Sequence, residues 1–245
     1  MKNPSNPGRV SRILGLVLLP LGLVACGGTS NTLSGTAATG APVVGGTVNV
    51  KCAGGPALTT TTASSGAWQV GMGGQTLPCK VKVSGGDLPV GQAFHSLAVD
   101  LGVVNITPVT ELVVASMAAK APGSWFDDDT PAEYQKITAT AVSTAIGKVR
   151  EALPLSALTT ANPLTTSFKA EKGDALDNVL EAIKAAIPDY GALLTAAQGA
   201  GFKTYAAEYA SALSTAFASA AASGSAGTGG SAGSVDLQQG HRLQR

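Results

Sequence analysis

The chain has 245 residues, a formal net charge of +1 and only 13% charged residues, while 44% of its residues are hydrophobic and 31 are glycines. Such a small, balanced charge provides no basic surface for nucleic acid, which argues against a nucleic-acid-binding protein. The length suits one large domain or two small ones, and with 4% aromatic residues the core must be mainly aliphatic.

The first 25 residues have the three parts of a secretory signal. Three basic residues precede an apolar run over 13–24, and the small residue Ala25 follows it. The run has about a dozen residues, whereas a helix that spans a membrane needs about 20. We therefore expect residues 1–25 to be a signal peptide that is removed, which takes away three basic residues and no acidic one.

The residues Leu23-Val24-Ala25-Cys26 resemble the lipobox of bacterial lipoproteins. In that family the cysteine thiol receives a diacylglycerol, the chain is cut before the cysteine, and the new amino group is acylated, so the resemblance implies that acyl chains such as palmitate anchor Cys26 in a membrane. Gly27 in place of aspartate resembles lipoproteins sorted to the outer membrane, which favours its periplasmic face or the cell surface. The alternative is ordinary secretory cleavage that leaves Cys26 unmodified.

Residues 26–33 are rich in glycine, serine and threonine and are expected to form a flexible tether. Between residues 34 and 106, apolar and polar residues alternate in short runs separated by glycine and proline, which predicts an antiparallel β-sandwich. The expected strands cover 35–36, 43–44, 47–52, 57–63, 67–72, 79–83, 96–100 and 102–106.

Cys52 and Cys79 remain as an even pair once Cys26 is assigned to lipid. Each lies on the apolar face of an expected strand, and cysteines outside the cytoplasm are commonly oxidised. We therefore predict a disulfide, which should stabilise the sheet domain by about 3–4 kcal/mol in the chain-entropy model. A metal site or a redox pair would need a C-x-x-C spacing or further ligands, and the sequence around these cysteines has neither.

The same region resembles the carboxypeptidase regulatory-like domain, a transthyretin-like β-sandwich. The resemblance lies in short motifs in a fixed order, namely Ser34-Gly35-Thr36, Gly40-x-Pro42-Val43-x-Gly45-Gly46-Thr47-Val48, Thr59-Thr60-Thr61, Gly66-x-Trp68-x-Val70 and Pro78. It implies the sandwich fold. In that family the module has no catalytic residues, and the fold alone does not define a function.

From residue 107 the apolar residues recur at helical spacing, which predicts an α-helical half over 107–222 and an α+β chain. Thr107 can cap a helix that starts at Pro108 and continues through 119, and Glu111 lies near its positive end. The first helix is apolar nearly all round and should be buried. With further helices over 130–153, 174–187, 190–197 and 202–222, we expect about five, the second beginning with a capping box of Thr130 and Glu133.

The last expected helix has an aromatic and aliphatic stripe, for which we expect core packing, although contact with a partner helix or a membrane surface is an alternative. The stripe comprises Phe202, Tyr205, Tyr209, Leu213 and Phe217. Residues 223–245 are expected to be a low-complexity spacer and a polar tail. The spacer contains a G-x-S-x-G pattern at 229–233, but no strand precedes it and no helix follows it, so it does not indicate a hydrolase.

The sequence offers few residues for catalysis. Its two histidines are His95, beside an expected strand, where a structural or solvent-facing role is expected, and His241 in the tail. Asp127, Asp128 and Asp129 form a dense acidic cluster, which we attribute to the following helix N-terminus, with calcium binding as the alternative. Trp125 and Phe126 could be an exposed aromatic contact, but packing over the helices is the preferred interpretation.

Together these features favour a protein without catalytic activity and without a cofactor. We expect a lipid-anchored cell-envelope protein with a binding or structural role, held to the membrane by Cys26 and with an envelope protein or a glycan as its partner. The alternatives are a carbohydrate-binding module and an accessory subunit of an envelope enzyme. No set of His, Asp, Glu, Cys or Ser residues converges in the sequence in the way that an active site requires.

Overall fold

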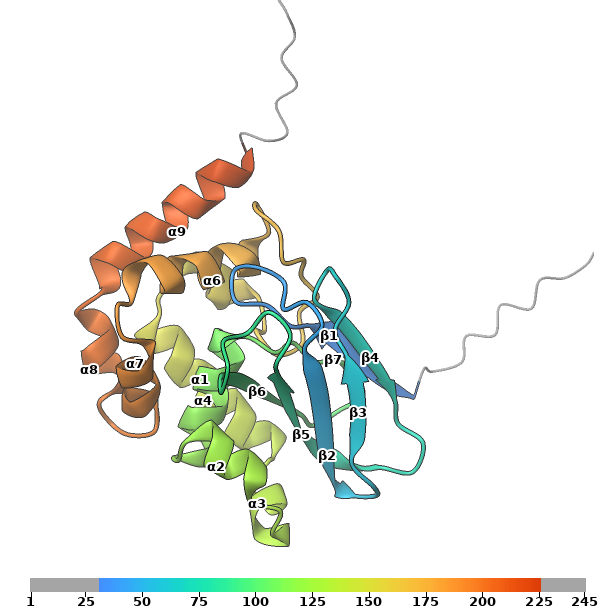
Figure 1. Cartoon of the computed structure of the whole chain (residues 1–245). Helices are drawn as coiled ribbons and strands as arrows, with labels where there is room; N and C mark the ends of the chain where they lie inside the picture. The colour runs from blue at the N-terminus through green and yellow to red at the C-terminus, as the bar shows by residue number, and fades with distance from the viewer. Residues whose placement is uncertain (1–30, 226–245) are drawn as a thin grey trace, which may run out of the picture.

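The computed structural model describes residues 31–225 and has a mixed α+β fold with two sheets (Figure 1), which confirms the expected class. One sheet has the strand order β3-β2-β5-β6 and the other has the order β4-β1-β7. The strands are β1 (Thr32–Thr36), β2 (Thr47–Gly54), β3 (Leu58–Thr61), β4 (Ala67–Gly71), β5 (Thr76–Ser84), β6 (Ala93–Ala98) and β7 (Gly102–Val103).

Most expected strands are present, with shifted ends. The first strand starts at Thr32, inside the expected tether over 26–33. Val43 and Val44 form no strand, because the chain turns there and the Val43 N–H donates back to the Ala37 carbonyl at 2.9 Å. The expected strand over 102–106 shortens to the two residues of β7, which pair with β1 in parallel.

The described residues contain nine helices rather than about five, because two of the expected helices are each divided in two and two further short helices form between the expected ones. They are α1 (Pro108–Ala118), α2 (Pro122–Asp127), α3 (Pro131–Gln135), α4 (Ala139–Ala152), α5 (Ser156–Thr160), α6 (Ala175–Ala186), α7 (Tyr190–Ala197), α8 (Phe202–Ala207) and α9 (Ala210–Ser225). The expected helix over 130–153 breaks before Thr138, whose hydroxyl caps α4 by accepting the Ala141 N–H at 3.1 Å. Helix α2 lies between the helices expected through 119 and from 130, where no helix was expected, and α9 extends into the expected spacer.

The expected capping box of Thr130 and Glu133 is absent. The Thr130 hydroxyl donates to Asp128 Oδ1 at 2.8 Å, and the Glu133 carboxylate lies 3.1 Å from the ammonium of Lys120. These contacts occupy both side chains, so neither of them caps α3. A capping box forms instead at α1, where the Thr110 N–H donates to the Thr107 hydroxyl at 3.2 Å and the Thr107 N–H donates to the Thr110 hydroxyl at 2.9 Å.

Strand β6 separates two hydrophobic cores, because both of its faces are buried. Phe94 and Ala98 point into the core shared by the two sheets, whereas Leu97 belongs to the core of the helices. This is the alternation that a strand imposes on successive side chains. In Figure 1 the helices lie to one side of the four-stranded sheet, with α1 and α2 next to β6.

The strand register places the cysteines on the inner face of the four-stranded sheet. Cys52 on β2 lies opposite Cys79 on β5, and the two form the predicted disulfide. The alternate residues Lys51 and Lys80 also lie opposite each other, on the outer face that the helices cover. The same register therefore buries the disulfide with the apolar side chains and turns the lysines towards α2.

The helices bury the side chains that their patterns predict. All residues of α1 from Pro108 to Ser116 are buried. In the stripe along α8 and α9, Phe202 and Leu213 belong to the core and Tyr205, Tyr209 and Phe217 pack against it, which confirms core packing. Among residues 31–225, none of the helices has the length and apolar character needed to cross a membrane.

Candidate functional site

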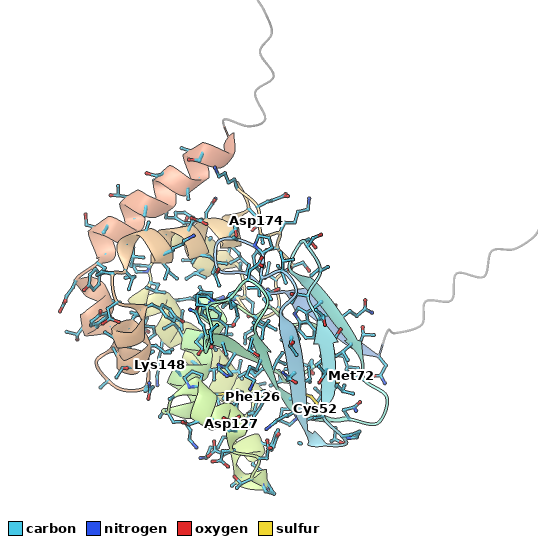
Figure 2. The ribbon with its side chains drawn as sticks, in the orientation of Figure 1. Cys52, Met72, Phe126, Asp127, Lys148 and Asp174 are labelled. Atoms are coloured by element: carbon cyan, nitrogen blue, oxygen red, sulfur yellow. A yellow bond between two sulfur atoms is a disulfide. The ribbon has the colours of Figure 1, made fainter. Side chains whose placement is uncertain are left out.

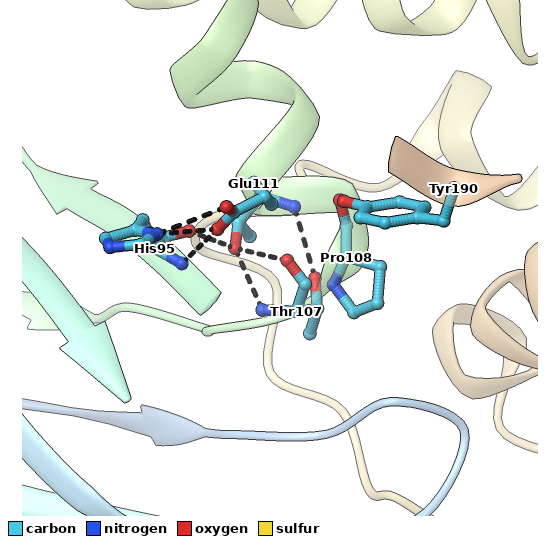
Figure 3. Close-up of polar contacts among 6 residues, drawn as sticks. His95, Thr107, Pro108, Glu111 and Tyr190 are labelled. Atoms are coloured by element: carbon cyan, nitrogen blue, oxygen red, sulfur yellow. Dashed lines mark hydrogen bonds and ion pairs between the residues drawn. The ribbon is translucent and has the colours of Figure 1, made fainter. Parts of the chain in front are cut away.

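A buried polar network joins β6 to the first turn of α1 (Figure 3). The Glu111 carboxylate accepts the His95 backbone N–H and lies 3.0 Å from His95 Nδ1 through Oε2. Thr110 donates its hydroxyl to the His95 carbonyl at 2.9 Å. The start of α1 at Thr107 and Pro108 places Glu111 and Thr110 in this first turn, so the helix start predicted from the sequence also positions the network.

Both members of the His95–Glu111 pair are removed from solvent, with residue exposures of 3% and 4%. The His95 ring is tilted against Phe126, with 5.7 Å between the ring centroids, and its Nε2 has no hydrogen-bond partner among the described residues. Such a pair fixes β6 against α1, because a buried charge or dipole without its partner would be costly. This geometry agrees with the structural role expected for His95.

Tyr190, the first residue of α7, contacts the same helix start from the other side. Its hydroxyl donates to the Pro108 carbonyl at 2.7 Å, and its ring meets the Phe94 ring edge-on at 6.3 Å. Burial, with a smaller contribution from the negative charge of Glu111, raises the pKa of Tyr190 well above its ordinary value. The hydroxyl therefore stays protonated and acts as a hydrogen-bond donor that holds α7 to α1.

A second buried group is Lys80, on the outer face of β5. Its side chain is fully buried, and its ammonium donates to the carbonyls of Trp125 at 2.7 Å and Asp128 at 2.6 Å. The ammonium also lies 4.9 Å from the Trp125 ring centroid and 4.6 Å from that of Tyr134. Burial lowers the pKa of Lys80, while the nearby carboxylates of Asp129, Glu133 and Asp128 oppose the shift.

Lys51 and Lys82 lie on the same outer face of the four-stranded sheet as Lys80, and we call these three residues the lysine face. The ammonium groups of Lys51 and Lys82 lie 4.9 Å and 4.5 Å from the Phe126 ring centroid. Figure 2 shows Phe126 on α2 where that helix meets the sheet. The exposed fractions of Trp125 and Phe126 are 0% and 2%, so these aromatic side chains pack in the core, as preferred, and do not form an exposed contact.

The acidic cluster is engaged by side chains of the protein. Asp129 pairs with the Lys51 ammonium at 2.8 Å and accepts the Tyr134 hydroxyl at 3.2 Å. Hydrogen bonds from the Thr130 hydroxyl and backbone N–H, followed by Lys120, lower the pKa of Asp128 to about 2. Residues 31–225 contain no group of three or more side chains placed to hold a metal ion, so the calcium alternative has no assembled site there.

A cleft of about 390 Å³ lies where the sheets meet the helices, and we call it the junction cleft. Its volume falls in the range of small binding sites, and most of its lining is apolar. The lining comes from the loop before β6, from β6 itself, from the start of α1, and from α6 and α7, and includes Leu88, Phe94, Pro108, Ile183, Ile187 and Tyr190. The polar network of His95 and Glu111 thus supports the wall formed by Phe94 and Pro108.

The structure describes some of the predicted site residues but not others. Cys52 and Cys79 form the expected disulfide, whereas Cys26, the signal peptide and the tail with His241 lie outside the described residues. Sequence reasoning missed the burial of Lys80, because alternation assigns it to the polar face without showing that α2 covers that face. The contact of Glu111 with His95 was also missed, and the position of Glu111 in an otherwise apolar helix was the signal that could have indicated a buried partner.

No protein-family model, no curated protein and no solved structure matches this chain. The resemblances to bacterial lipoproteins and to the carboxypeptidase regulatory-like domain therefore remain expectations drawn from short motifs.

Proposed function

We propose that this chain is a lipid-anchored, non-catalytic protein of the bacterial cell envelope, built from a transthyretin-like β-sandwich and a helical half. The observation that carries the proposal is the lipobox-like stretch Leu23–Cys26 behind a short apolar leader. Two or three acyl chains on one cysteine would hold the protein firmly, because each buried CH₂ contributes about 0.8 kcal/mol. The outer membrane is the proposed location.

The arrangement of the chemically versatile side chains supports a role without catalysis. His95 and Glu111 are buried against each other, and neither lines the junction cleft. The Lys80 ammonium is used by two backbone carbonyls and two aromatic rings. An acid, a base or a nucleophile has to reach a substrate, and these groups instead hold β6 and β5 against the helices.

The two sheets support the proposed sandwich. They share one hydrophobic core, to which β1 contributes Leu33, β2 contributes Val50 and β4 contributes Trp68. In a sandwich the inward side chains of both sheets interdigitate in this way. The helical half is proposed to begin at residue 107, where the buried α1 follows β7.

Labelling with palmitate tests the anchor. The full chain, produced in a Gram-negative bacterial host, should incorporate labelled palmitate and appear in the membrane fraction. The Cys26→Ser variant should lose the label and leave the membranes, because it lacks the thiol that accepts the lipid. A Cys52→Ser/Cys79→Ser variant is the matched control and should still be labelled. An unlabelled wild-type chain, or a labelled Cys26→Ser variant, would contradict the proposal.

A further inference from the structure

The loop that precedes β6 carries a fully exposed aliphatic side chain next to the junction cleft. Leu88 and Pro89 of this loop line the cleft, and the next residue, Val90, is fully exposed. Gly91 follows with φ of +83°, a conformation that glycine adopts without strain and that lets the chain turn back to β6. The turn therefore presents Val90 as an apolar projection beside an apolar hollow.

Two opposite charges border the same cleft. Asp87 lies on the loop and Lys184 lies on α6; both are exposed and both line the cleft. In the part of the chain from residue 31 to 225, neither side chain has an ion-pair partner. By contrast, Lys51 on the outer sheet face and Lys120, which lies between α1 and α2, each pair with an aspartate.

A surface that contains a projection, a hollow and both charges is complementary to itself. In a two-fold dimer the same patch is used by both copies, so each contact occurs twice with the roles exchanged. We propose that the junction cleft is a self-association surface, on which Val90 of one copy inserts into the junction cleft of a second copy and Asp87 of each copy pairs with Lys184 of the other.

The pattern of charges around the cleft favours a second copy of this chain as its occupant. A second copy satisfies both the carboxylate and the ammonium and also covers Val90. Electrostatic complementarity of this kind gives an interface its specificity and register. Two copies tethered to one membrane would meet at a high effective concentration, so a modest affinity would suffice. The proposal rests on the surface of the described residues; the proposed lipid anchor would raise the effective concentration but is not required for the contact.

The mass of the full chain in a non-ionic detergent tests the proposal by light scattering coupled to size exclusion, with the detergent contribution subtracted. The measurement should run up to about 100 µM protein, where an interface with a Kd in the micromolar range is mostly occupied. We expect the mass of a dimer for the wild-type chain. Val90→Asp should raise the dissociation constant by at least about tenfold, because it places a charge in an apolar contact. Leu101→Asp, at an exposed leucine on the turn after β6, should leave the dimer intact.

A charge exchange gives the sharper result. Asp87→Lys and Lys184→Asp should each weaken the dimer, because each variant brings like charges together twice. The double variant Asp87→Lys/Lys184→Asp should restore it. Circular dichroism at a protein concentration low enough for the wild-type chain to be monomeric should show little change in the unfolding temperature, since all of these positions are exposed.

Three outcomes would overturn the inference. They are a monomer at every concentration, a dimer unaffected by Val90→Asp, and single charge variants whose defect the double variant does not repair. A monomer that is still labelled with palmitate would reject self-association and leave the proposed anchor standing. A monomer whose cleft takes up a small apolar probe, such as a fluorescent naphthalene sulfonate, would assign the cleft to a small ligand in place of a second copy.

Discussion

Asp177 on α6 is a buried carboxylate that its surroundings do not satisfy. It is 1% exposed, and its Oδ1 accepts no hydrogen bond from any residue between 31 and 225. Burial, followed by the like charges of Glu181, Asp174 and Glu171, raises the pKa of Asp177 from 3.8 to about 6. The folded protein therefore binds a proton at this site more tightly than the unfolded chain does.

This raised pKa makes the stability depend on pH in a definite direction. Well below pH 4 the carboxyl group is protonated in both states. Between about pH 4 and pH 6 the unfolded chain ionises while the folded protein keeps its proton, so the stability falls as the pH rises, and it levels off above about pH 6, where the folded state ionises too. Asp177→Asn removes the ionisation, so we expect it to raise the free energy of unfolding at pH 8 by about 1–3 kcal/mol, with little effect at pH 4. Urea unfolding at the two pH values measures the difference.

Asp100 provides the control for this prediction, because it is exposed on the turn after β6. Asp100→Asn should change the free energy of unfolding by no more than about 0.5 kcal/mol at either pH. An effect of Asp177→Asn that is equal at pH 4 and pH 8 would show that the carboxyl group is not the cause.

At the scale of elements, α2 is held to the sheet by a lysine rather than by apolar contacts alone. The Lys80 ammonium reaches the last turn of α2 at Trp125 and the residue after it at Asp128. Helix α2 has only six residues, and its N-cap residue, Ala121, has no side-chain cap. A helix this short depends on tertiary contacts, because its own hydrogen bonds cannot offset the entropy of forming it.

Replacing Lys80 tests this dependence. Lys80→Met keeps the length of the side chain but leaves two carbonyls without their donor, so we expect a loss of about 2–4 kcal/mol in the free energy of unfolding. Hydrogen exchange over 122–127 should accelerate more than exchange in β2. Lys82→Met is the matched control, because within residues 31–225 the Lys82 ammonium lies over the Phe126 ring but makes no hydrogen bond or ion pair, and it should cost less than about 1 kcal/mol. Equal losses in the two variants would refute a special role for Lys80.

At the scale of the whole molecule, the disulfide closes the part of the chain that links the two sheets. Between Cys52 and Cys79 lie β3, which belongs to the four-stranded sheet, and β4, which belongs to the three-stranded sheet. The bridge joins the neighbouring strands β2 and β5. In the unfolded chain it therefore still holds together the two ends of the segment that contains β3 and β4. Its effect on stability should therefore involve both sheets.

Two measurements check the disulfide. Thiol titration of the denatured, unreduced mature protein should find neither Cys52 nor Cys79 reactive, and reduction should release both thiols. The Cys52→Ser/Cys79→Ser variant should lose about 2–4 kcal/mol of unfolding free energy, because the unfolded chain gains freedom. Two reactive thiols before reduction would contradict the bridge.

The sequence by itself determined the local features of this protein. The alternation of apolar and polar residues, together with the glycines and prolines between the runs, located most strands and placed both cysteines on an inner face. Thr107 and Pro108 marked the start of α1 within one residue, because a capping hydroxyl and a missing N–H act only on the nearest turn. These signals depend on neighbouring residues and can be read without knowing the fold.

Only the tertiary structure decided what covers each face and where the long helices break. The alternation of apolar and polar residues showed that Lys80 points to the opposite face of the strand from Cys79. It could not show that Trp125 and Asp128, far along the chain, would cover that face. The junction cleft and the pairing of Glu111 with His95 likewise join segments that are distant in sequence. Burial and charge pairing are properties of the assembled cores, so no local pattern specifies them.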